Sequence, residues 1–115
     1  MTKDRFRFRV WNKTEKVYLK MPEMHCDNTS CFLSVMEDEV LEQCTGLKDK
    51  NGRLIYEGDI VFYGGVELWW VVFEEKYCSF ELLRKDGNGL SMSAHKEMTV
   101  VGNIHENPEL LENKK

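Results

Sequence analysis

Short runs of β-forming residues, separated by glycine, asparagine and aspartate, fill most of this chain. Tight-turn signals divide the runs at 51–52 (Asn-Gly), 64–65 (Gly-Gly) and 86–89 (Asp-Gly-Asn-Gly). Asparagine and glycine tolerate the positive φ that tight hairpin turns require. A length of 115 residues suits one domain. The pattern predicts a single, mainly β domain over 1–115, folded as a small, partly open SH3-like β-barrel.

The N-terminal part predicts a β-hairpin. Residues 6–11 begin with alternating side chains, which is typical of a half-buried strand, and residues 16–19 supply a second strand after a polar turn. The alternation places Phe8 and Val10 on one face. It places three basic side chains on the other face: Arg5, Arg7 and Arg9.

Residues 22–39 lack a clear period and are interpreted as a variable loop region. Within it, 32–36 fit a strand or a helix; the strand is preferred, with an exposed turn at 37–39. At the other end, a proline follows a capping asparagine, which predicts a short C-terminal helical turn. Residues 112–115 are expected to fray.

Residues 66–73 form the most apolar run and predict a central strand that is buried on both faces. Trp69 and Trp70 are adjacent, so they point to opposite sides of a strand. One of the two is therefore a candidate contact residue, because large aromatic side chains are enriched at interfaces. A weakly indicated strand is expected at 90–94, and a more strongly indicated one at 99–101.

Two carboxylates flank a glycine just before the apolar run that starts at Ile60. Glu57 and Asp59 could divide acid and base roles, as paired carboxylates do in some enzymes. Gly58, however, marks a turn there, and an aspartate in a turn accepts backbone N–H groups. We interpret the pair as structural and predict no catalytic residues. His95 and His105 are expected on the surface.

The cysteines raise the question of a metal site or disulfides. His25, Cys26 and Cys31 are metal-ligand types, and Cys44 or Cys78 could supply a fourth ligand, but no second matching pair is present. We predict no metal and no cofactor. The sequence shows no signal-like apolar run near Met1 and no membrane-length apolar stretch. We therefore expect a cytoplasmic protein with reduced thiols and no membrane contact.

Charge is unevenly distributed along the chain. The net charge is −4, yet residues 1–20 hold seven Lys or Arg against two acids, and residues 21–45 hold six acids and no Lys or Arg. Arg5, Arg7 and Arg9 could therefore meet a phosphate backbone. They could equally pair with the acidic segment 37–39 of the same or a neighbouring subunit, which is the preferred interpretation.

Several segments together resemble the YopX family, a group of small proteins from phages and prophages, mostly of Gram-positive bacteria. They are FRVW (8–11), TGLKDKNG (45–52), IYEGDIV (55–61) and VGNIHENPEL (101–110). The resemblance implies a mostly β fold, a phage or prophage origin and a homo-oligomer, and it implies no established activity. The residues taken as its structural motif are Gly46, Asp49, Asn51, Gly52, Glu57, Gly58, Asp59, Gly102, Asn107 and Pro108.

The functional hypothesis is a non-enzymatic protein of the bacterial cytoplasm that acts by self-assembly or by binding a phage or host protein. The candidate interaction residues are Trp69, Trp70, Arg5, Arg7 and Arg9. The alternative is a small nucleic-acid-binding barrel that uses the basic N-terminal strand.

Overall fold

The computed structural model describes residues 7–19, 24–26, 31–33, 37–65 and 67–111. Most of these residues are in strands, which confirms the mainly β prediction. The strands are β1 (Phe8–Asn12), β2 (Val17–Leu19), β3 (Met24–Cys26), β4 (Cys31–Leu33), β5 (Glu39–Lys48), β6 (Leu54–Tyr56), β7 (Asp59–Tyr63), β8 (Glu67–Glu74), β9 (Ser79–Leu83), β10 (Gly89–Ser91) and β11 (Thr99–Asn103). Two 3-10 helices complete the description: η2 (Met92–Glu97) and η3 (Pro108–Leu111).

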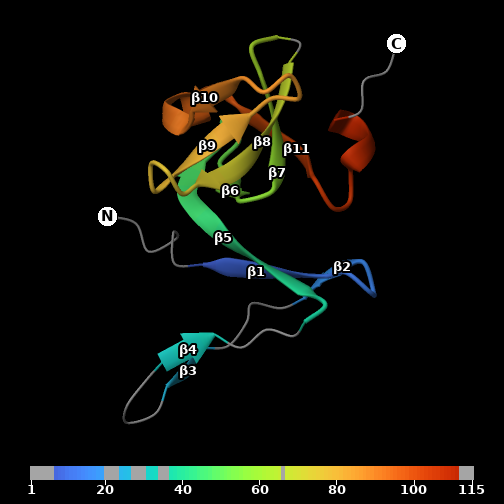
Figure 1. Ribbon diagram of the computed structural model, residues 1–115. Coiled ribbons are helices and arrows are strands. Elements are labelled where there is room, and N and C mark those ends of the chain that lie inside the picture. The colour runs from blue at the N-terminus through green and yellow to red at the C-terminus, as the bar shows by residue number, and fades with distance from the viewer. Residues whose placement is uncertain (1–6, 20–23, 27–30, 34–36, 66, 112–115) are drawn as a thin grey trace.

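The strands form two antiparallel sheets and a separate two-stranded pair. The first sheet has the order β2-β1-β5-β6, the second has the order β10-β9-β8-β7-β11, and β3 pairs with β4. The long strand β5 joins the two parts of the molecule (Figure 1): its first half pairs with β1 and its second half with β6. Gly46, at φ 84°, lies within the register shift of the β5–β6 pairing, between Cys44 and Lys48.

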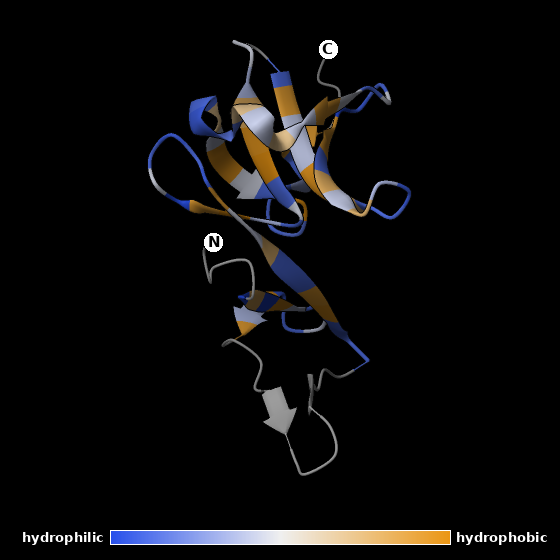
Figure 2. Cartoon of the chain, turned by 90° about the vertical axis from the view of Figure 1, so that its left-hand side faces the viewer, coloured by the Kyte–Doolittle hydropathy of each residue, from blue (hydrophilic) through white to orange (hydrophobic). Residues whose placement is uncertain are grey.

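The apolar core lies between the curled five-stranded sheet and the β5–β6 hairpin. Trp69 and Val71 of β8 point into it, together with Ile55 of β6 and Met98 before β11. Figure 2 shows the hydrophobic colour concentrated on the strands of this sheet and the hydrophilic colour in its loops. The core therefore forms where the sequence alternates, with one apolar face per strand.

Strand β8 is central in its sheet, as predicted, but the prediction that both of its faces are buried is wrong. Only the face with Trp69 and Val71 is buried in the core, whereas Trp70 and Val72 are half-buried on the other face. The hydrophobic run could not show this difference, because tryptophan and valine suit a strand whether its second face is closed or open to a pocket.

Near both ends of the described chain, the structure agrees with the elements predicted from the local sequence. β1 and β2 form the predicted N-terminal hairpin, with Trp11 opposite Tyr18, and η3 is the predicted C-terminal helical turn. Residues 112–115, expected to fray, lie outside the described residues.

Two predicted segments need correction. The variable loop region contains two paired strands, β3 and β4, with Cys26 opposite Cys31; the strand preferred for 32–36 is present at 32–33. The strand expected at 90–94 ends at Ser91, where the hydroxyl accepts the N–H of Ser93 and starts η2. Serine at this position caps a helical turn better than it extends an edge strand.

Candidate functional site

A buried row of charged side chains joins the two sheets. Arg9 of β1 lies directly opposite Glu42 of β5 in the sheet register. Its Nε donates to Glu42 Oε1 at 2.8 Å, and its Nη2 forms an ion pair with Asp59 Oδ1, also at 2.8 Å. The side chains of Glu42 and Asp59 are 4% and 1% exposed, and that of Arg9 is 16% exposed. One guanidinium therefore pairs with two carboxylates from different sheets.

Aromatic rings enclose this guanidinium. The Arg9 Cζ lies 4.5 Å from the ring centroid of Tyr18 and 4.8 Å from that of Tyr56, which are cation–π distances. The Tyr18 hydroxyl also donates to Glu42 Oε1 at 3.1 Å. Burial raises the pKa of Tyr18, so this hydroxyl remains a hydrogen-bond donor. Ring contacts and hydrogen bonds consequently fix the position of the guanidinium.

His105 completes the hydrogen bonds of Glu42 from the opposite side. Its Nε2 donates to Glu42 Oε2 at 2.8 Å, and its ring stacks on Trp11 with centroids 4.9 Å apart and planes 12° apart. The prediction that His105 is a surface residue is wrong: its side chain is 17% exposed. His95, also expected on the surface, is half-buried, and its Nδ1 lies 2.7 Å from the Lys48 carbonyl. Glu42 therefore accepts hydrogen bonds from β1, from β2 and from the segment after β11.

The turn between β6 and β7 places the second carboxylate pair. Asp59 Oδ2 accepts the N–H of Tyr56 at 2.8 Å, which is the turn role predicted for it. Gly58, at φ 88°, bonds through its N–H to Val71 and through its carbonyl to Ile104. A Cβ at Gly58 would lie 2.5 Å from Glu42 Oε2, so the close approach itself requires glycine.

Glu57 and Asp59 are not equivalent. Burial raises the pKa of both carboxyl groups, for Asp59 despite the nearby Arg9 guanidinium. Asp59 is enclosed, whereas Glu57 is half-buried and accepts the N–H of Gln43 at a long 3.3 Å. The two carboxylates therefore do not form an accessible acid–base pair.

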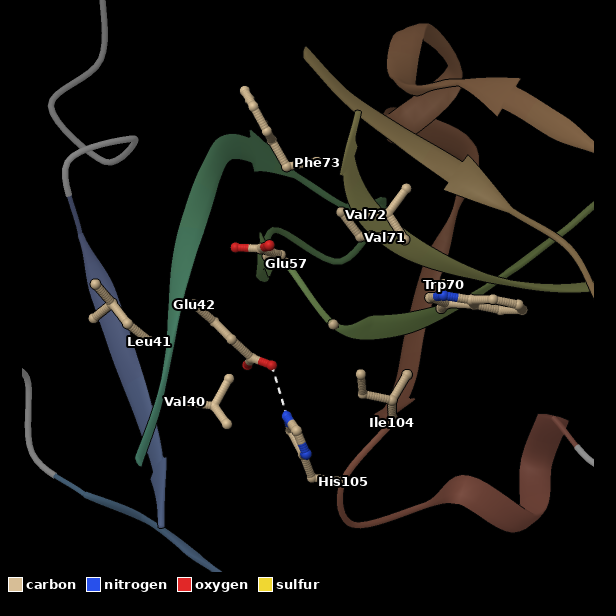
Figure 3. Close-up of a pocket in the computed structure, with 11 residues that line it drawn as sticks. Val40, Leu41, Glu42, Glu57, Trp70, Val71, Val72, Phe73, Ile104 and His105 are labelled. Carbon is tan, nitrogen blue, oxygen red and sulfur yellow. Dashed lines mark hydrogen bonds and ion pairs between the residues drawn. The ribbon is translucent and has the colours of Figure 1, made fainter. Parts of the chain in front are cut away.

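A pocket of about 280 Å³ opens beside this cluster, between β5 on one side and β8 on the other (Figure 3). Two carboxylates and one imidazole contribute to it, and most of the remaining wall is apolar. The lining residues are Val40, Leu41, Glu42, Glu57, Gly58, Trp70, Val71, Val72, Phe73, Ile104 and His105. The pocket therefore combines an apolar wall with a partly desolvated acidic end.

The two tryptophans are separated by the strand, as the alternation requires. Trp69 is 6% exposed in the core, with the Arg84 guanidinium 5.1 Å from its ring centroid. Trp70 is half-buried and lines the pocket. Of the two interaction candidates, Trp70 is thus the one placed at an accessible surface.

The three candidate arginines have different positions. Arg5 lies outside the described residues, and Arg7 is exposed. The preferred pairing with the acidic segment 37–39 is wrong for Arg9, whose partners are Glu42 and Asp59. Val10 and Trp11 are both buried, so both faces of β1 are covered where a half-buried strand was expected.

The central motif residues stabilise the turn after β5. Asp49 accepts three backbone N–H groups, from Asn51, Arg53 and Val100, each at 2.9 Å. Gly52, at φ 83°, closes the same turn. Although burial would raise it, these three hydrogen bonds lower the pKa of Asp49.

The C-terminal motif residues stabilise the turn after β11 in a similar way. Asn107 Oδ1 accepts the N–H of Asn103, and a Cβ at Gly102 would lie 2.5 Å from that oxygen. Asn103 Oδ1 in turn accepts the N–H of His105 at 3.0 Å. Pro108 then begins η3. These turns orient His105 toward Glu42.

Cys44 and Cys78 are the cysteines whose side chains the structure describes, and their surroundings differ. Cys44 is completely buried in β5, whereas Cys78 is exposed in the turn between β8 and β9. Residues 24–26 and 31–33 are described by their strand pairing only. Elsewhere in the described ranges, no three His, Cys, Asp or Glu side chains cluster suitably for a metal ion. Within those same residues, no helix has the length and apolarity to cross a bilayer.

Sequence reasoning did not select Trp11, Tyr18, Glu42 or His105. Glu42 is 33 residues from Arg9 and 63 residues from His105, so no local pattern connects them. One signal was available: Glu42 and Val40 share a strand face, so a glutamate there interrupts an otherwise apolar face. A charged residue on a buried face requires a partner, and Arg9 is that partner.

Comparison with known proteins agrees with this architecture. The family described as YopX protein matches residues 23–112, which is most of the chain. The chain belongs to the YopX family. The YopX-family match begins after β1 and β2, so Arg9 and Trp11 lie outside it and Glu42 and His105 lie inside it.

Two solved structures extend the likeness over nearly the whole chain. Protein EF1440 from Enterococcus faecalis is 25% identical, with a TM-score of 0.60, and the alignment covers 92% of this chain and 97% of that one. Protein YopX from Bacillus subtilis is 18% identical, with a TM-score of 0.57, and the alignment covers 95% and 98%. A search of curated proteins returned no match. These likenesses establish a fold shared by the family.

Proposed function

We propose that this YopX-family protein is a non-enzymatic binding module that contacts a protein partner at the inter-sheet pocket. The observation that carries the proposal is the position of Trp70, half-buried on the pocket wall. Phe73, which also lines the pocket, is 42% exposed. Tryptophan in such positions is enriched among residues that dominate binding energy. Trp69 faces the core and stabilises the fold instead.

The arrangement of ionisable groups supports a binding role over catalysis. Arg9, Glu42, Asp59 and His105 are hydrogen-bonded or ion-paired with one another or with neighbouring side chains. Asp59 is 1% exposed and cannot reach a ligand in the pocket. Acid–base catalysis needs a group within hydrogen-bond reach of the substrate and with a suitable pKa. The cluster instead joins the two sheets.

A second copy of the chain is the first candidate partner, and a phage or host protein is the second. This part of the proposal, with a prophage origin and a cytoplasmic setting, rests on the resemblance to phage-encoded members of the family. Nucleic-acid binding is less well supported, because Arg9 is already ion-paired with Glu42 and Asp59 and so does not present its charge to a phosphate.

The test measures solution mass and partner capture for the wild type, Trp70→Ala and Tyr77→Ala. Tyr77 is a matched aromatic control, because it is 62% exposed in a turn and does not line the pocket. We expect Trp70→Ala to weaken association about tenfold or more, as loss of a hot-spot residue does, while Tyr77→Ala leaves it unchanged.

Three results would overturn the proposal. The first is a strictly monomeric protein that captures no partner from phage-induced cells. The second is association that Trp70→Ala leaves intact while the variant unfolds more easily. The third is salt-dependent binding to DNA or RNA that requires Arg7, which would favour the nucleic-acid alternative.

A further inference from the structure

The two glutamates of the pocket differ in how fully they are neutralised. Glu42 accepts hydrogen bonds from Arg9, Tyr18 and His105. Glu57 accepts the backbone N–H of Gln43 at 3.3 Å, and among the described residues it takes part in none of the ion pairs. Among the described residues, the pocket therefore contains one carboxylate with three side-chain donors and one with no direct ion pair.

The surroundings of Glu57 make this unpaired charge costly. The side chain is half-buried beside β5 and β8, and burial raises the pKa of its carboxyl group. The nearby charge of Glu42 raises this pKa further, whereas the Gln43 N–H and the Arg9 guanidinium lower it without cancelling the rise. A cation placed next to Glu57 would offset both effects, because a partly buried carboxylate gains more from a counterion than an exposed one does.

The remaining walls suit an aliphatic chain. Val40, Trp70, Val72 and Ile104 line the pocket between its two sides (Figure 3). Lysine and arginine place their methylene stems along such apolar surfaces while the charged group reaches a polar site. Trp70 adds an aromatic ring, which is the best cation–π acceptor among side chains.

The size and charge of the pocket favour a small cationic ligand. Its volume of about 280 Å³ lies below the roughly 300–1,000 Å³ typical of pockets for drug-sized ligands. A phosphate or carboxylate ligand would face Glu42 and Glu57, and the one imidazole of the lining, His105, is already bonded to Glu42. A single side chain or a small amine fits these limits.

We propose that the pocket binds an ammonium or guanidinium group carried on an aliphatic chain, with Glu57 as its counterion and Trp70 and Val72 as its walls. In the proposed function, on which this inference rests, the ligand is a lysine or arginine side chain of the protein partner. The same chemistry could be supplied by a free aliphatic amine, and the experiment below distinguishes these two sources.

The experiment follows the Trp70 indole N–H resonance in two-dimensional ¹H–¹⁵N NMR, assigned with Trp70→Phe. The wild type is titrated with n-butylammonium, n-butylguanidinium, Nα-acetyl-lysine amide and uncharged 1-butanol. We expect saturable shifts with the cations and binding of 1-butanol that is about tenfold weaker or more, because the charge-assisted contact is missing. The lysine amide should bind at least as tightly as the free amine if a protein side chain is the natural ligand.

Glu57→Gln and Glu75→Gln form a matched pair of variants. Both remove one negative charge, but Glu75 is exposed in the turn after β8 and does not line the pocket. We expect Glu57→Gln to remove the preference for cations over 1-butanol and Glu75→Gln to keep it. Equal binding of charged and uncharged probes to the wild type would overturn the inference, as would a Glu57→Gln variant that keeps its preference with an unchanged spectrum elsewhere.

The outcomes separate this inference from the proposed function. If Trp70→Ala abolishes protein association while the cation preference is independent of Glu57, the binding module stands and the cation site is wrong. If the cation preference depends on Glu57 but the chain associates with no protein, the site stands with a free amine as its ligand. The proposed function would then be wrong.

Discussion

Two buried regions stabilise this protein, and they differ in the kind of side chain that fills them. The core of the five-stranded sheet is apolar, with Val61, Trp69 and Leu82 supplied by the consecutive strands β7, β8 and β9. The junction between the sheets is charged and aromatic, with Arg9 and Glu42 at its centre. Its members come from segments far apart in the sequence. The core closes one sheet upon itself, whereas the junction fixes how the second sheet sits against it.

Asp49 and Asp59 show how the two regions shift the pKa of the same residue type in opposite directions. Each accepts a backbone N–H in a tight turn that contains a glycine with positive φ. At Asp49, three N–H groups outweigh burial and lower the pKa; at Asp59, burial outweighs Arg9 and the Tyr56 N–H and raises it. A turn can therefore stabilise a carboxylate locally, but the junction depends on a counterion from another sheet.

The largest expected effect on stability is at Arg9, where a single substitution leaves two buried carboxylates without their cation. We expect Arg9→Met to lower the free energy of unfolding by about 3–5 kcal/mol, as loss of one partner from a buried ion pair does. Urea denaturation would measure it.

The matched control neutralises the carboxylates as well. The triple variant Arg9→Met, Glu42→Gln, Asp59→Asn should recover part of this loss, because the unpaired charges are gone. If the triple variant is no more stable than Arg9→Met alone, the charges of the junction contribute net stability, and the contrast with the apolar core weakens.

The second prediction concerns the turn attached to the core. Asp49→Ala removes the acceptor of three backbone N–H groups, one of which belongs to buried Val100. We expect a loss of about 3 kcal/mol, mostly from the buried donor left without a partner. The effect should extend to β11, so hydrogen exchange of the Val100 amide should accelerate. An unchanged exchange rate there would show that the turn does not stabilise β11.

Sequence reasoning was sufficient for the tight turns and insufficient for the junction, for one physical reason. Turns depend on neighbours within a few residues, so Asn51-Gly52 and the turn at Gly58 could be interpreted directly. The open second face of β8 and the partners of Arg9 depend on which sheet packs opposite. The basic pattern of β1 therefore suggested a solvated face, although Arg9 points to Glu42 and Asp59.

The third prediction compares glycines in the two regions. Gly52 and Gly58 share a positive φ, but a Cβ at Gly52 would meet nothing within 4 Å, whereas one at Gly58 would meet Glu42 at 2.5 Å. Gly52→Ala should therefore lower the free energy of unfolding by about 1 kcal/mol from backbone strain alone. Gly58→Ala should cost about 2–3 kcal/mol, because it also displaces Glu42. Thermal or urea unfolding of both variants measures the difference, and equal losses would mean that Glu42 moves aside freely.

The smallest effect is a difference in sign between two pH profiles. Asp49 has a pKa below its ordinary value of 3.8, so its stabilisation is complete above that value and disappears as the pH falls through the lowered pKa. Glu57 has a pKa above its ordinary value of 4.5, so the folded state holds its proton more tightly than the unfolded state does. The wild type therefore gains stability from Glu57 as the pH falls through that raised pKa.

In urea titrations between neutral and acid pH, Asp49→Asn should start less stable than the wild type and approach it as the pH falls. Over the same pH change, the free energy of unfolding of Glu57→Gln should fall relative to that of the wild type, because glutamine cannot take up the proton. Parallel profiles for the two variants would mean that the surroundings of Glu57 stabilise its charged form as well as those of Asp49 do. The two regions would then not differ at this site.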